Sequence, residues 1–143
     1  MTIDQVSVFV ENAPGKLAGL TRILAEANVD IRAMSLADNT EYGILRMIVN
    51  DTAAALKALE RNDCIVSVTQ VLAVEINDRP GSLSQVLGVL EKEGISVEYL
   101  YAFITRKADD AYVIFRIEDT DRANVVLAEN GIRTASPHDL YDL

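Results

Sequence analysis

The feature that most constrains this chain is a short stretch that occurs twice. The first copy reads Glu11-Asn12-Ala13-Pro14-Gly15-Lys16-Leu17 and the second reads Asn77-Asp78-Arg79-Pro80-Gly81-Ser82-Leu83. An alternating apolar pattern typical of a strand precedes each copy, and apolar residues at helical spacing follow it. Since Asn12 and Asp78 lie 66 positions apart, the fold must place the same strand-to-helix connection at two equivalent points.

The residue types in this stretch predict a compact strand-to-helix elbow. An Asn or Asp side chain can accept a hydrogen bond from the backbone ahead of it, and Pro suits the first helical turn. Gly lets another group approach the backbone closely. The free N–H groups of the first turn lie at the positive end of the helix dipole and suit a carboxylate or phosphate. Two such elbows indicate a duplicated ligand-binding module.

The match between the halves extends beyond the elbows. Leu17 matches Leu83 at the offset of 66, and Leu59 matches Leu127 at an offset of 68, after a longer turn from Arg106 to Asp110. The patterns of the first half predict strands over 3–10, from 29, over 42–49 and over 64–69, with helices over 14–28 and 52–61 and a polar turn at Asn39-Thr40-Glu41.

Repeats of this kind outrank other signals when a fold is inferred, and the cycle β-α-β-β-α-β is the ferredoxin-like pattern. The sequence therefore predicts an α+β protein of two ferredoxin-like repeats packed side by side, over 1–70 and 71–143. The second repeat ends in a short tail, in which Ser136-Pro137-His138-Asp139 has the pattern of a helix start.

The net charge, the length of the apolar runs and the cysteine count each argue against certain functions or locations. The formal net charge of −9 argues against binding to nucleic acid or to anionic membranes. No apolar run approaches the roughly 20 residues of a membrane span. The single cysteine and an N-terminal segment without the regions of a signal peptide lead us to expect a cytoplasmic protein.

Catalysis has no evident basis in the residues. The chain has one His, at 138, and one Cys, at 64, which lie far apart in the sequence and argue against a nucleophilic dyad. Metal-ligand spacing and a Gly-rich phosphate loop are absent from the sequence. An acylphosphatase-like enzyme of the same topology would need an Arg-bearing loop where Ala13–Lys16 stands. We therefore expect a protein that is not an enzyme, with no catalytic residue, metal or cofactor.

The two elbows within a βαββαβ cycle resemble the ACT domain family. A short motif of Asn or Asp, any residue, Pro, Gly, any residue and Leu stands at the first turn of each half. The resemblance covers nearly the whole chain, 3–70 and 71–136, and includes no attached catalytic domain. It implies a regulatory protein that binds a small amino acid or related zwitterion between paired ACT domains, in a homodimer or with a partner enzyme.

The resemblance also implies particular site residues. The first elbow resembles that of serine-sensing members, whose Asn corresponds to Asn12 and whose second polar contact corresponds to Asp30. Those members have a His where this chain has Val10, which argues against serine itself. The implied ligand-binding residues are Asn12, Ala13, Gly15, Lys16, Leu17 and Asp30 in the first repeat, and Asp78, Gly81, Ser82, Leu83 and Ser96 in the second.

Two alternatives remain open at this stage. Asn12 and Asp78 can serve only to fix the turn, and Asp30 only to solvate the start of a strand. The whole chain can also be an interaction module that regulates a partner enzyme without binding a small ligand. Between the elbows, the first is the better candidate, because the negative charge of Asp78 competes with a ligand carboxylate.

Overall fold

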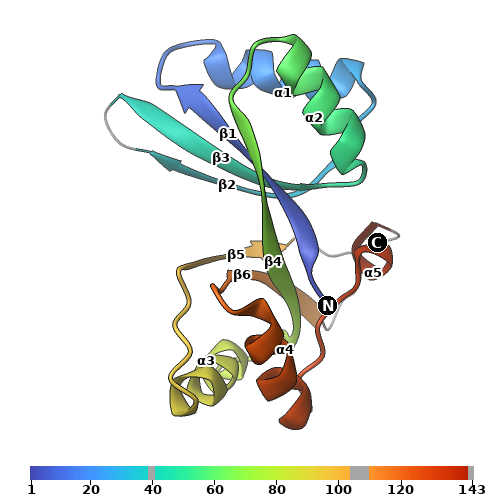
Figure 1. The fold of residues 1–143 in the computed structure, drawn as a ribbon. Coiled ribbons are helices and arrows are strands. Elements are labelled where there is room, and N and C mark those ends of the chain that lie inside the picture. Colours follow the sequence, from blue (N-terminus) through green and yellow to red (C-terminus); the bar gives the residue numbers. More distant parts are fainter. Residues whose placement is uncertain (39–40, 104–109, 142–143) are drawn as a thin grey trace. The chain divides into compact units, whose positions relative to one another are not determined.

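The computed structural model describes residues 1–38, 41–103 and 110–141 (Figure 1). Their contacts divide them into two compact units. The first unit comprises Asp4–Thr69, and the second comprises Met1–Ile3 with the described residues from Gln70 onward. The elements follow in the order β1 (Ile3–Glu11), α1 (Lys16–Glu26), β2 (Ile31–Asp38), β3 (Tyr42–Val49), α2 (Thr52–Arg61), β4 (Val66–Asn77), α3 (Ser82–Lys92), β5 (Tyr99–Phe103), β6 (Asp110–Arg116), α4 (Thr120–Glu129) and α5 (Pro137–Tyr141).

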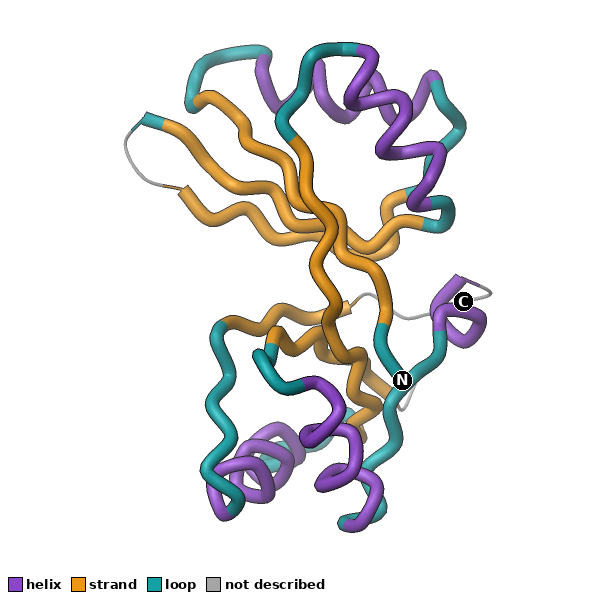
Figure 2. The backbone as a smooth tube through the Cα atoms, in the orientation of Figure 1, coloured by secondary structure: helices purple, strands orange, loops and turns teal. Residues whose placement is uncertain are grey.

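The first unit is an antiparallel sheet with both of its helices on one face (Figures 1 and 2). Its strand order is β2-β3-β1, followed by the beginning of β4. Alternation along β1 sends every second side chain into the core beneath α1 and α2. The buried members of this core are Val6, Val8, Val10, Leu20, Leu24, Val29, Leu45, Met47, Val49, Ala55 and Leu59.

The second unit repeats this plan with β4, β6 and β5 in antiparallel order. Its fourth strand is reduced to a single bridge between Val74 and Thr134. Helices α3 and α4 cover one face (Figure 1). The buried core residues are Leu72, Val74, Val86, Leu90, Val113, Phe115, Ile117, Ala123 and Leu127. The prediction of two ferredoxin-like α+β repeats is therefore confirmed.

The second residue after each of the helices α1 to α4 has a positive φ in both units. Each helix of the first unit is followed by a non-glycine residue with positive φ, Asn28 at 56° and Asp63 at 60°. The matching positions of the second unit hold glycine, Gly94 at 66° and Gly131 at 69°. The left-handed conformation that ends a helix suits Gly best and Asn or Asp next. Both halves therefore keep one backbone geometry with different residues.

Three sequence predictions need correction or lie outside the described residues. The first helix begins at Lys16 and not at 14, because Gly15 has a φ of 84° that no helix accepts. The fourth strand begins at Val66, two residues later than predicted, and runs on through the first strand of the second repeat. The predicted turns fall largely outside the described residues, at 39–40 and 106–109.

The C-terminal tail forms the predicted helix start. The backbone N–H of Ser136 donates to Asp139 Oδ2 at 2.8 Å, and the N–H of Asp139 donates back to Ser136 Oγ at 3.2 Å. This reciprocal pair is a capping box. Leu140, in the helix that follows, is fully buried, so the capped turn fixes a core residue.

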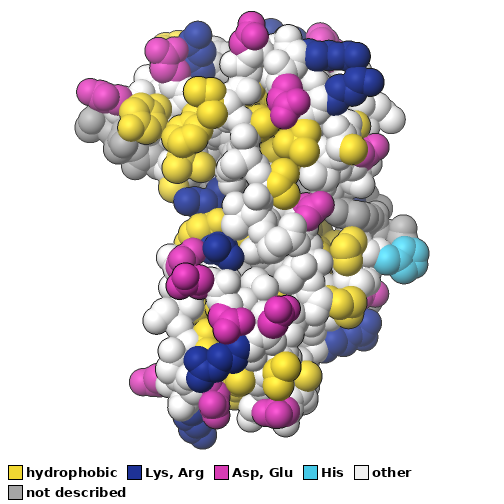
Figure 3. Space-filling model, viewed as in Figure 1, with side chains coloured by type: hydrophobic (Ala, Val, Ile, Leu, Met, Phe, Trp, Pro, Cys, Tyr) yellow, Lys and Arg dark blue, Asp and Glu magenta, His cyan; other side chains and the backbone are white. Residues whose placement is uncertain are grey.

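No helix of the described residues is long and apolar enough to cross a membrane. Among the same residues, no group of three or more His, Cys, Asp or Glu side chains is arranged to hold a metal ion. On the face shown in Figure 3, acidic and basic side chains are interspersed. That face therefore offers no single charged patch to a polyanion or polycation.

Candidate functional site

Each elbow is a type II turn, and the two copies have nearly the same geometry. In the first, the N–H of Lys16 donates to the carbonyl of Ala13 at 3.2 Å, and Gly15 has φ 84° and ψ −10°. Pro at the second and Gly at the third position are the residues that a type II turn prefers. In the second elbow, the backbone N–H of Ser82 donates to the carbonyl of Arg79 at 3.2 Å, and Gly81 has φ 90° and ψ −11°.

This turn corrects the predicted role of the Asx side chains. Neither α1 nor α3 has a side-chain hydrogen bond at its N-cap, which is the glycine of the turn. The first bond closing α1 runs from the N–H of Gly19 to the carbonyl of Gly15 at 2.9 Å. No group of the described residues accepts from the N–H groups of Leu17 and Ala18. Two donors at the positive end of the helix are therefore open to an anion.

A hollow of about 430 Å³ adjoins the first elbow. Its lining comes from the end of β1, from one side of α1 and from the segment between α2 and β4. More of this lining is apolar than polar. The lining residues are Phe9, Val10, Glu11, Gly15, Lys16, Gly19, Leu20, Ile23, Asn62, Asp63, Cys64 and Ile65. We call this space the first hollow.

The second unit has a hollow at the equivalent place, of about 310 Å³. Its lining is more polar than apolar. We call it the second hollow. Since all ten of its positions match lining positions of the first hollow at the offsets of the repeat, the duplication includes the space beside the elbow. The lining residues are Glu75, Ile76, Asn77, Ser82, Gln85, Val86, Asn130, Gly131, Ile132 and Arg133.

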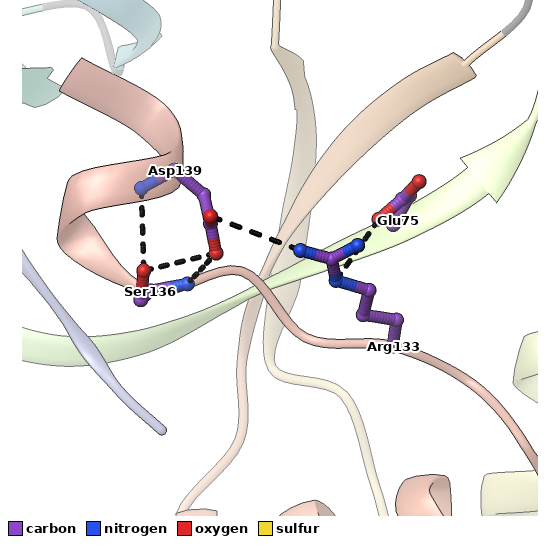
Figure 4. A network of polar contacts seen from close by, with 4 residues as sticks. All are labelled: Glu75, Arg133, Ser136 and Asp139. Atoms are coloured by element: carbon purple, nitrogen blue, oxygen red, sulfur yellow. Dashed lines mark hydrogen bonds and ion pairs between the residues drawn. The ribbon is translucent and has the colours of Figure 1, made fainter. Parts of the chain in front are cut away.

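The same backbone hydrogen bond occurs beside both hollows, but the two residues that it joins are apolar in the first unit and charged in the second. The N–H of Phe9 donates to the carbonyl of Ile65 at 3.1 Å, and the N–H of Glu75 donates to the carbonyl of Arg133 at 2.9 Å. The apolar pair of the first unit is thus replaced by a charged pair in the second. Arg133 Nε lies 3.5 Å from Glu75 Oε2, and Arg133 Nη2 lies 3.7 Å from Asp139 Oδ1 (Figure 4).

The first hollow is lined by one cationic and two anionic side chains, Lys16, Glu11 and Asp63. Lys16 Nζ lies 3.5 Å from Glu11 Oε2, and both side chains are more than half exposed. An exposed pair of this kind contributes little to stability. Partial burial, and then the nearby charge of Asp63, raises the pKa of the Cys64 thiol. The thiol therefore remains protonated at neutral pH and adds no charge to the hollow.

The structure gathers some of the predicted site residues and separates others. Gly15 and Lys16 line the first hollow, and Ser82 lines the second. The other predicted elbow residues belong to the turns or first helical residues but do not line these hollows. They are Asn12, Ala13 and Leu17 in the first unit, and Asp78, Gly81 and Leu83 in the second. All six are exposed or half-buried.

Asp30 lies at the start of β2 and already has partners. Its backbone N–H donates to Asn50 Oδ1 at 2.8 Å, and its carboxylate accepts from Arg32 Nη1 at 2.9 Å. Ser96, its counterpart in the second unit, is exposed and lines two other hollows, of about 320 and 270 Å³. Neither residue lines the hollow beside its own elbow.

Sequence reasoning missed most of the lining. Phe9, Gly19 and Ile65 lie far apart in the sequence and meet beside the first elbow only through the fold. The match between Asn62 and Asn130 was the available signal, since both line a hollow. Each Asn side chain donates to the carbonyl four residues earlier at 2.8 Å, which ends the helix before the hollow.

Two ferredoxin-like repeats, each with a Pro-Gly type II elbow and an adjoining hollow, define a tandem module of the ACT type. The family model of the ACT domain pair matches residues 1–143, and the chain belongs to this family. A comparison with curated proteins found no match.

Several solved structures have the same fold. The protein BT0572 from Bacteroides thetaiotaomicron is 38% identical, with a TM-score of 0.93 over 100% of this chain and 98% of that one. The regulatory subunit of aspartate kinase from Thermus thermophilus, in a ligand-free form, is 16% identical, with a TM-score of 0.62 over 88% and 90%. The corresponding subunit from Thermus flavus is 17% identical, with a TM-score of 0.61 over 88% and 90%.

Proposed function

We propose that this ACT domain pair is a regulatory protein that reversibly binds a small amino acid or related zwitterion and catalyses no reaction. The observation that carries the proposal is the duplicated elbow, with two open backbone donors and a hollow beside it. Both hollows are of the size that holds a small molecule. The regulatory aspartate kinase subunits named above support a regulatory role through their shared fold.

The chemistry of the first elbow fits an α-amino acid. The ligand carboxylate would accept from the open N–H groups of Leu17 and Ala18, at the positive end of α1. The ammonium requires acceptors, and the side-chain carbonyl of Asn12 at the elbow can supply one. Glu11 would have to leave Lys16, which lies 3.5 Å away. The Asp30 carboxylate could accept from the ammonium only after releasing Arg32, because Asp30 Oδ2 lies 2.9 Å from Arg32 Nη1. We therefore rank Asn12 above Asp30.

The effector would bind where two ACT domains pair, in a homodimer or with a partner enzyme in the cytoplasm. Within the described residues β2 and β5 each have one strand neighbour, so each leaves an edge free for pairing. On β2, Met34 and Leu36 are about half exposed. This exposed apolar edge also favours the second candidate, an interaction module that binds no small ligand.

Native mass spectrometry and calorimetry together separate the two candidates. A retained amino acid, or saturable binding in a screen of the common amino acids, supports the sensor. Asn12→Ala should then weaken binding about 10- to 100-fold, since a hydrogen bond to a charged group contributes roughly 1.5–3 kcal/mol. Asp78→Ala is the matched control and should weaken it less. A complete absence of binding would leave only the interaction module.

A further inference from the structure

We propose that the segment 95–98, which leads from α3 into β5, is an open strap and that Glu118 keeps it from closing onto the end of β6. We call this segment the strap. The matching segment of the first unit is closed, so the repeat shows both forms. Closure would lengthen β5, an edge strand, and it requires no bound amino acid.

Two reciprocal hydrogen bonds close the matching segment of the first unit. The backbone N–H of Asp30 donates to Asn50 Oδ1 at 2.8 Å, and the N–H of Asn50 donates to the carbonyl of Asp30 at 3.1 Å. Strand pairing therefore continues past a register shift to the pair of Ile31 and Val49. The Asp30 carboxylate also accepts from Arg32 Nη1 at 2.9 Å, so the side chain is fixed as well as the backbone.

Neither reciprocal hydrogen bond has an equivalent in the second unit. At the offsets of the repeat, Ser96 stands in the place of Asp30, and Glu118 stands in the place of Asn50. Both Ser96 and Glu118 are exposed, both lie in the described part of the chain, and no hydrogen bond joins them. Glu118 is one methylene longer than Asn50 and is charged, and it stands beside the carboxylate of Asp119 that caps α4. The strap is therefore not fastened at this end.

The open strap shortens the edge strand and adjoins free space. The pairing of β5 with β6 begins at Tyr99 and Arg116. The next pair that the first unit leads us to expect, Val97 with Ile117, is not part of this ladder. Hollows of about 320 and 270 Å³ adjoin the strap, and Ser96 lines both. Pairing of another chain along β5 would favour closure, because the longer edge offers more hydrogen bonds.

Amide hydrogen exchange of the full chain, followed by NMR, tests the proposal on matching amides of one molecule. In the wild type, the amide of Asp30 should exchange at least about tenfold more slowly than that of Ser96, after correction for intrinsic rates. Glu118→Asn supplies the acceptor of the first unit. It should slow exchange at Ser96 about tenfold or more, the net effect of two hydrogen bonds. It should also create a nuclear Overhauser effect between Val97 and Ile117.

Glu118→Gln is the matched control, because it removes the same charge but keeps the longer side chain. Exchange at Ser96 should stay within about twofold of the wild-type rate in this variant. The reciprocal change, Asn50→Glu, should speed exchange at Asp30 about tenfold, and it keeps the test available if Glu118→Asn does not fold. Equal protection of Asp30 and Ser96 in the wild type, or unchanged exchange at Ser96 in Glu118→Asn, overturns the proposal. Equal slowing in Glu118→Gln also overturns it, since loss of charge would then explain the effect without the fastening bonds.

Discussion

Asp63 ends α2 in a conformation that an L-residue adopts at a cost, and its replacement by glycine should stabilise the protein. Its φ is 60°, and the equivalent residue of the second unit is Gly131 with a φ of 69°. Both positions make the same backbone bonds, so conformation can be compared without a change of contacts. The N–H of Asp63 donates to Glu60 at 3.1 Å and that of Gly131 donates to Ala128 at 3.1 Å.

Two effects add in Asp63→Gly. Relief of the left-handed strain gives about 1 kcal/mol, of which the greater freedom of glycine in the unfolded chain removes about 0.5 kcal/mol. Loss of a negative charge at the C-terminal end of α2 adds about 0.5 kcal/mol, because that end of the helix dipole is itself negative. The free energy of unfolding should therefore rise by about 1 kcal/mol, and the Tm by about 4 °C.

Urea titration of four variants separates these effects. Asp63→Asn removes the charge alone and should recover about half of the gain. Asp63→Ala removes the charge but suits the left-handed conformation poorly, so it should gain nothing or destabilise. Gly131→Ala in the second unit should cost about 1 kcal/mol. If Asp63→Ala stabilises as much as Asp63→Gly, the conformational argument is wrong and the charge explains the whole effect.

Two further predictions concern the cores and the tail. Leu59 and Leu127 occupy matching positions and are both fully buried. In urea titrations, Leu59→Ala and Leu127→Ala should each lower the free energy of unfolding by about 2–5 kcal/mol. A loss under about 1 kcal/mol would contradict a role in the core. Hydrogen bonds from the Ser136 N–H and hydroxyl hold the pKa of Asp139 below its ordinary value. These hydrogen bonds therefore stabilise the folded state above about pH 4, and this stabilisation is lost as the pH falls through the lowered pKa. The difference in the free energy of unfolding between wild type and Asp139→Asn should accordingly shrink below about pH 4. A difference that stays constant with pH would show that the tail carboxylate is not ionised in this role.

The element cycle could be predicted from the sequence because strand and helix periods differ clearly here. The alternation of Val6, Val8 and Val10, and the helical spacing from Leu17 to Leu24, each fit one structure only. The helix start could not be predicted to the residue. Proline has the same φ in the first turn of a helix as in a type II turn, so Pro14 is compatible with both.

The hollow beside the elbow could not be predicted, for a different reason. Its lining depends on which residues of β1 and of the segment before β4 lie side by side, as in the bond between Phe9 and Ile65. Such a juxtaposition is set by the pairing of distant strands and not by local spacing. The partner of Asp30 was within reach of sequence reasoning, because Arg32 lies two residues along a strand and therefore on the same face.

The position of Cys64 gives the protein a built-in place for an optical reporter. It is the one cysteine of the sequence, and it lines the first hollow, where the second hollow has Ile132. A thiol-directed fluorophore would attach at one atom without any mutation. Because the thiol pKa is raised, the coupling requires mildly alkaline buffer. The emission of such a conjugate would report on the first hollow alone, so the natural chain itself offers a direct optical test of the binding proposed above.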